Sequence, residues 1–132
     1  MNINKAEFKF FIRNIVANHV EEELDLYDID GEEMINTVLE GETKDNIDLT
    51  DSPEFKFGFG EVVESIKFIG IVIGTLKTLN DFAVLFRNRD PETTELEDAW
   101  RSHLIDEGLA EEKAEAIIQK FGDDLRKNFI KK

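Results

Sequence analysis

The chain has 132 residues, 41% of them hydrophobic, and a formal net charge of −14 from 30 acidic and 16 basic residues. This length and apolar content predict a single folded domain over residues 1–132 rather than a disordered chain. The absence of cysteine excludes disulfides, thiolate metal sites and a cysteine nucleophile. The acidic balance argues against direct binding to nucleic-acid phosphates, because such binding needs a basic surface.

The first half of the chain alternates helical and irregular patterns. Apolar residues recur at spacings of three and four between Phe8 and Val20, which predicts a helix over residues 4–24. A short helix is predicted over Glu32–Glu40, closed by Gly41, and residues 42–52 are predicted to be loop. Phenylalanines then alternate with lysine and glycine, which predicts a minor β element near residues 55–59. The pattern leaves open whether Phe55–Phe59 belong to the core or to an interface.

The most apolar part of the chain is predicted to be a central helix over residues 61–87. Its apolar positions surround the helix almost completely, which is typical of a buried helix. Residues 66–73 are also rich in β-branched side chains, so a buried strand is the alternative there. Charged residues interrupt the segment before it reaches the roughly 20 apolar residues that a membrane span needs. The start of the chain lacks the pattern of a secretory signal, so we expect a cytoplasmic protein.

The last third predicts further helices. Asp90-Pro91-Glu92 is a typical helix start, and Gly108 is predicted to end that helix. A short helix is predicted from Ala110 to Phe121, broken by Gly122, with one or two final turns over residues 123–131. The predicted fold is therefore mainly α: a single-domain bundle of five or six helices around a buried central helix.

The negative charge is concentrated in residues 21–54, which we name the acidic segment. It holds fourteen acidic residues and one base, Lys44. Apolar side chains are interleaved with the acids, namely Leu24, Leu26, Tyr27, Ile29 and Ile47. Carboxylates around apolar anchors are typical of a surface that attracts a basic protein. We predict that the centre of this contact surface is formed by Tyr27, Asp28, Asp30, Glu32 and Glu33.

The sequence contains no complete motif for catalysis or cofactor binding. Ser102 and His103 are neighbours on a predicted helix and point about 100° apart, so they do not form a nucleophile–base pair. Asp28-x-Asp30-Gly31 resembles part of a calcium loop but lacks its first and last ligands, which favours a solvated acidic loop. Gly58-Phe59-Gly60 lacks the spacing of a dinucleotide-binding turn. We predict no catalytic, cofactor or metal residues and no enzyme, although thirty carboxylates leave a carboxylate-only enzyme as a further hypothesis.

These observations predict a non-catalytic protein-binding protein. The first hypothesis is an acidic inhibitor or immunity-type protein that covers the basic surface of a toxin, a nuclease or another nucleic-acid-binding protein. The alternative is an adaptor or scaffold that acts through an apolar surface and self-association. Gly70 and Gly74 fall on one face of the central helix, where close packing within the chain is favoured over a homodimer seam. A homodimer stays possible.

Overall fold

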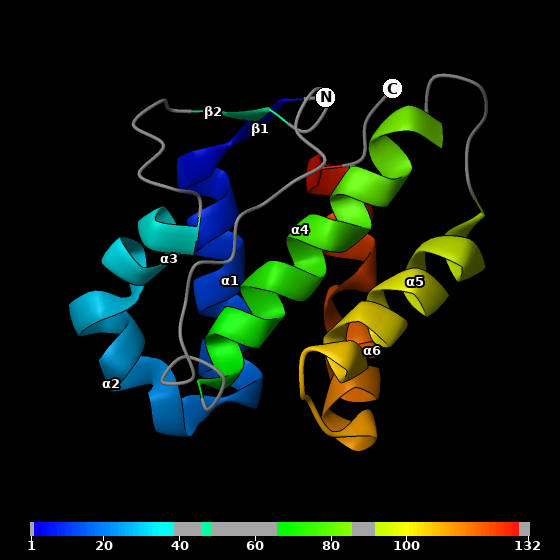
Figure 1. The fold of residues 1–132 in the computed structure, drawn as a ribbon. Helices are drawn as coiled ribbons and strands as arrows, with labels where there is room; N and C mark the ends of the chain where they lie inside the picture. The colour runs from blue at the N-terminus through cyan, green and yellow to red at the C-terminus, as the bar shows by residue number, and fades with distance from the viewer. Residues whose placement is uncertain (1, 39–45, 49–65, 86–91, 130–132) are drawn as a thin grey trace.

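A computed structural model describes residues 2–38, 46–48, 66–85 and 92–129, and these form a mainly α-helical bundle (Figure 1). In chain order the elements are β1 (Asn2–Asn4), α1 (Lys5–His19), the 3-10 turn η1 (Glu21–Glu23), α2 (Leu24–Leu26), the π-helical turn η2 (Tyr27–Gly31), α3 (Glu32–Val38), β2 (Asn46–Asp48), α4 (Lys67–Leu85), α5 (Thr93–Asp106) and α6 (Glu111–Phe129). The helical class predicted from the sequence is confirmed.

Helix α4 forms the centre of the bundle, as its apolar pattern predicts. Residues 68–76 are all buried, and α1, α3 and α5 pack against this helix. The strand alternative for residues 66–73 is wrong, because the segment is helical from Lys67 onward. The hydroxyl of Thr75 and the indole of Trp100 are paired within this core. The Trp100 indole N–H donates to Thr75 Oγ1 over 3.0 Å, and the Thr75 hydroxyl donates to the Ile71 carbonyl.

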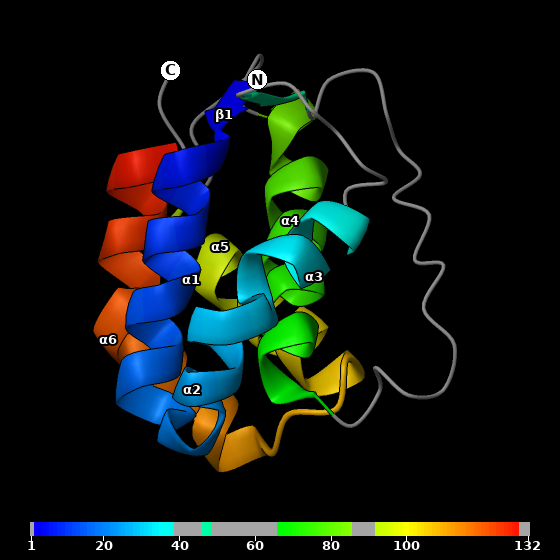
Figure 2. The same ribbon diagram turned by 90° about the vertical axis from the view of Figure 1, so that its left-hand side faces the viewer.

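Helices α1 and α6 lie side by side along one face of the bundle (Figure 2). Phenylalanine rings join them, because Phe11 makes edge-to-face contacts with Phe121 and Phe129 at centroid distances of 6.0 and 5.2 Å. Edge-to-face contacts of this kind stabilise aromatic pairs beyond the burial of their area. The rings therefore connect the first and last helices of the chain.

The predicted break at Gly122 is wrong, because α6 continues through it to Phe129. The buried positions of α6 keep one helical spacing on both sides of the glycine, from Ala114 to Phe129. A Cβ atom at Gly122 would lie 3.2 Å from Glu97 Oε1 on α5. That atom is the end of a flexible side chain, so the helix continues because its buried face packs on α1 and α5, and this packing outweighs the low helix propensity of glycine.

The amino-terminal half departs from the predictions in two places. The helix predicted over residues 4–24 ends at His19, since Val20 leaves helical geometry and is fully buried. The loop predicted over residues 42–52 includes strand β2, which pairs antiparallel with β1 so that Ile3 is opposite Ile47. This pairing joins residues more than forty positions apart, so local pattern does not reveal it.

Helix α5 ends as predicted. Its chain turns at Gly108, which has a φ of 100°, a left-handed conformation that favours glycine. The Glu92 N–H at the start of this helix donates to the Glu95 carboxylate. The predicted β element at residues 55–59 and the Gly41 helix end lie outside the described residues.

Candidate binding surface

Four of the five predicted contact residues form one exposed acidic surface. Residues 24–38 run through α2, η2 and α3 without leaving helical structure, so the acids stand on consecutive turns. Asp28, Asp30, Glu32 and Glu33 are all exposed, and so is Asp25 one turn earlier. We name residues 25–33 the acidic turn. The solvated loop predicted around Asp28 and Asp30 is therefore a π-helical turn, a rare element that occurs frequently at functional sites.

Tyr27, the fifth predicted contact residue, belongs to the core instead. Its side chain is 4% exposed, its ring packs edge-to-face on Phe68, and its hydroxyl donates to the Lys9 carbonyl over 2.7 Å. Burial, followed by the negative charge of Glu32, raises the pKa of the phenol. Gly31 makes room for the ring, since a Cβ there would lie 2.8 Å from it. Tyr27 thus fixes the acidic turn on α1 and is not an exposed anchor.

Ile29 provides the exposed apolar side chain that Tyr27 was expected to provide. It is 78% exposed, more than any other large apolar residue among the described side chains. Exposed carboxylates flank it along the chain on both sides, at Asp25 and Asp28 before it and at Asp30, Glu32 and Glu33 after it. The sequence already places Ile29 among the acids, but only the structure shows that it, and not Tyr27, points outward.

Asp28 connects the acidic turn to α1 through a two-point ion pair. Its carboxylate oxygens lie 2.9 Å from Nε and 3.3 Å from Nη2 of Arg13, and both side chains are about half exposed. The hydrogen bond to Asp28 raises the pKa of Arg13. Exposed ion pairs contribute little stability on their own. The pair instead holds the turn in place next to α1.

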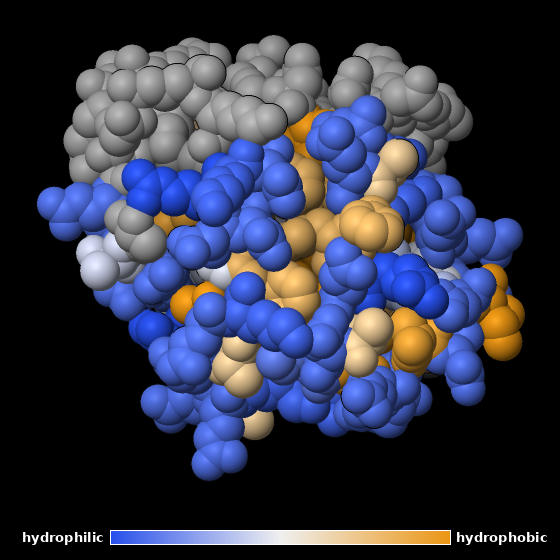
Figure 3. Space-filling model, turned by 180° about the vertical axis from the view of Figure 1, so that it is seen from behind, coloured by the Kyte–Doolittle hydropathy of each residue, from blue (hydrophilic) through white to orange (hydrophobic). Residues whose placement is uncertain are grey.

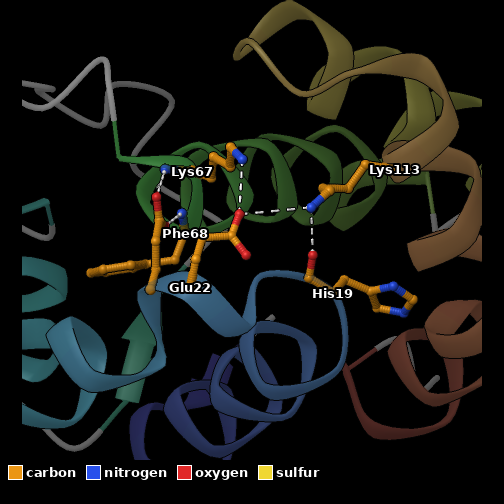
Figure 4. A network of polar contacts seen from close by, with 6 residues as sticks. His19, Glu22, Lys67, Phe68 and Lys113 are labelled. Atoms are coloured by element: carbon orange, nitrogen blue, oxygen red, sulfur yellow. Dashed lines mark hydrogen bonds and ion pairs between the residues drawn. The ribbon is translucent and has the colours of Figure 1, made fainter.

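Glu22 and Glu23, near the start of the acidic segment, have structural roles, and Figure 4 shows this region from close by. Glu22 lies 2.9 Å from Lys67 Nζ and 4.0 Å from Lys113 Nζ, so it joins the starts of α4 and α6. The Glu23 carboxylate accepts the backbone N–H groups of Lys67 and Phe68 at 2.9 and 2.8 Å. The first N–H groups of a helix lack partners within it, so a carboxylate at this position satisfies them and suits the helix dipole.

A groove of about 520 Å³ runs between α1 and the acidic turn. Its α1 wall carries Lys5, Lys9 and Arg13, and its other wall includes Tyr27 and Glu32. Phe10, 66% exposed, stands at its edge on α1. The candidate surface therefore joins an acidic, apolar-centred turn to a basic helix face, an arrangement suited to recognising another macromolecule by charge and shape.

The two histidines have different surroundings. His103 Nε2 on α5 lies 2.7 Å from Asp81 Oδ2 on α4. The His19 ring packs edge-to-face on Phe121, and its buried Nε2 has no hydrogen-bond partner among the described residues. Burial and the charges of Lys120 and Lys113 lower the pKa of His19.

The chain matches no protein-family model, no curated protein and no solved structure. Within the described residues, no helix is long and apolar enough to cross a membrane. In the same part of the chain, no group of three or more histidine, aspartate or glutamate side chains is arranged to hold a metal ion.

Proposed function

We propose that this chain is a non-catalytic protein-binding protein of the acidic inhibitor type, whose acidic turn covers a basic surface of another protein. The observation that carries the proposal is Ile29, which is 78% exposed in the middle of exposed carboxylates. Protein interfaces combine a central apolar anchor with a charged rim, and Ile29 among these carboxylates has this composition. The acids that hold the fold together, Glu22 and Glu23, lie outside this turn.

The charge of the whole chain supports the same partner class. A net charge of −14 attracts basic proteins over a distance and accelerates their association, and salt weakens this effect. Nucleases, other nucleic-acid-binding proteins and basic toxins present such surfaces, and we propose the cytoplasm as the place where the two proteins meet. The adaptor alternative is less favoured at the face of α4 that carries Gly70 and Gly74. A Cβ at either position would contact residues 103–109 of the same chain, so this face packs within the chain.

The test is an affinity purification with the tagged chain in three forms. The first is the native sequence. The second carries Asp30→Lys and Glu32→Lys in the acidic turn. The third carries Asp106→Lys and Glu111→Lys, which change the net charge equally at exposed positions elsewhere. Circular dichroism first establishes that all three are folded.

We expect the native and control forms to retain the same basic protein in stoichiometric amount at low salt and to release it at high salt. The acidic-turn variant should lose this protein. With the purified partner, Asp30→Lys/Glu32→Lys should mainly slow association, whereas Ile29→Ser should mainly speed dissociation. Equal retention by the acidic-turn variant, or a partner that resists high salt, would refute the proposal.

A further inference from the structure

A second hollow lies on the other side of Phe10, between α1 and α6. It has a volume of about 290 Å³ and is lined by Glu7, Phe10, Phe11, Asn14, Phe121, Asp124, Asn128 and Phe129. Figure 3 shows the face behind that of Figure 1, where apolar surface gathers in the middle and hydrophilic side chains surround it. The volume is at the small end for ligand pockets, so it suits one long side chain rather than a large cofactor.

The inner wall of this hollow is aromatic. Phe11, Phe121 and Phe129 are each 6% exposed or less, and Phe11 touches both other rings edge-to-face. Phe10 projects at the edge with 66% of its surface exposed. The core does not use this fourth ring. Phe10 is exposed next to a hollow that three other rings line. An aliphatic chain that enters the hollow would therefore contact apolar surface on more than one side.

The charged residues of the lining are both acidic. Glu7 comes from α1 and Asp124 from α6, both are exposed, and the structure gives neither carboxylate an ion pair among the described residues. Asn14 and Asn128 add amide oxygens, and no basic residue belongs to the lining. An anion would be repelled here, whereas a cation with an apolar stem would meet both carboxylates and ring surfaces.

We infer that this hollow receives an arginine side chain presented by a partner protein. The guanidinium group stacks on aromatic faces and pairs with carboxylates, and it is more weakly hydrated than an ammonium group. Its three-carbon stem would lie along the phenylalanine rings while the head reaches Glu7 and Asp124. One cation already lies near these rings: Lys120 Nζ, which donates to Asn18 Oδ1, is 5.9 Å from the Phe121 ring centroid.

This site is separate from the acidic turn, and it does not rest on the proposed function. Phe10 on α1 lines both the hollow and the groove, so the two surfaces lie on opposite sides of this side chain. A protein seated across α1 would contact both, with its basic group in the hollow and not against the groove wall that carries Lys5, Lys9 and Arg13. The inference names the residue type that such a partner inserts beside Phe10.

The experiment is a titration followed by nuclear magnetic resonance, with n-butylguanidinium chloride as the probe and neutral n-butylurea as its matched analogue. We expect saturable shifts at Phe10, Phe121 and Phe129, with a dissociation constant in the millimolar range, on the order of −4 kcal/mol. The neutral analogue should bind at least about fivefold more weakly, because it carries no positive charge to pair with the two carboxylates.

Charge-removing variants distinguish binding in the hollow from attraction by the negative charge of the whole chain. Glu7→Gln/Asp124→Asn should weaken the probe about fivefold or more, whereas Asp106→Asn/Glu111→Gln removes the same charge at exposed positions away from the hollow and should leave binding unchanged. Asp30→Lys/Glu32→Lys should also leave it unchanged, so this result is independent of the test of the acidic turn. The inference would be overturned if the chemical shifts rise linearly with probe concentration and do not saturate. It would also be overturned if the first two variant pairs have equal effects, or if n-butylurea binds as well as n-butylguanidinium.

Discussion

The substitution Gly74→Ala tests whether the small-residue face of α4 is covered by the chain itself. A Cβ at this position would lie 3.1 Å from Leu104 Cδ2 and 3.3 Å from the backbone carbonyl of His103, both on α5. Leu104 is fully buried, which limits how far its methyl group can turn away, and the His103 carbonyl is part of the helix backbone and cannot move without shifting α5. The methyl group therefore has to separate two packed helices.

The expected size of this effect follows from two opposing terms. One extra methyl group in a packed core costs about 1–3 kcal/mol, and alanine is a better helix former than glycine by about 1 kcal/mol. Gly74→Ala should therefore lower the free energy of unfolding by about 1 kcal/mol. In the matched control, Gly122→Ala, the added atom meets the end of the flexible Glu97 side chain. Gly122→Ala should therefore keep most of the gain in helix propensity and raise the free energy of unfolding by about 1 kcal/mol.

Thermal and urea unfolding followed by circular dichroism measure the difference between the two variants. A difference of about 2 kcal/mol corresponds to about 8 °C in melting temperature for a chain of this size. Gly74→Ala should melt below the native protein and Gly122→Ala above it. If both variants are stabilised equally, α5 does not cover Gly74, and the glycine face becomes available for a second copy of the chain.

Three further outcomes are expected. Glu23→Ala removes the carboxylate that accepts two N–H groups at the start of α4, so it should lower the unfolding free energy by about 1 kcal/mol. The control Glu21→Ala changes an exposed residue and should have little effect. Equal effects of the two variants in urea unfolding would contradict the capping role of Glu23. Tyr27→Phe loses one buried hydrogen bond and should cost about 1 kcal/mol without changing the affinity for the partner; loss of partner binding at unchanged stability would show that the hydroxyl is a contact group. The pKa of His19 is lower in the folded chain than its usual value of 6.5, so the unfolded chain binds more protons below that pH, and stability should fall as pH falls from about 6.5. His19→Gln should flatten this part of the stability profile between pH 7 and 5, and an unchanged profile would exclude His19 as its source.

The sequence predicted the parts of the fold that depend on local pattern. The apolar spacing of α1, the nearly all-round apolar surface of α4 and the capping residues of α5 are each local signals, and each element is present. The prediction at Gly122 was wrong because low helix propensity is a local signal, whereas the packing of α6 on α1 and α5 that keeps the helix continuous is not. The pairing of β1 with β2 was missed for the same reason.

For the candidate surface, the sequence by itself determined that the negative charge gathers in one segment with apolar residues between the acids. Only the tertiary structure decided what each of these residues does. It turns Glu22 and Glu23 toward the ends of other helices, buries Tyr27 between α1 and α4, and leaves Ile29 exposed. It also brings Glu7 and Asp124 to one hollow from opposite ends of the chain. Charge and hydrophobicity are properties of single residues, but direction and neighbours are set by how the helices pack, and that depends on the whole chain.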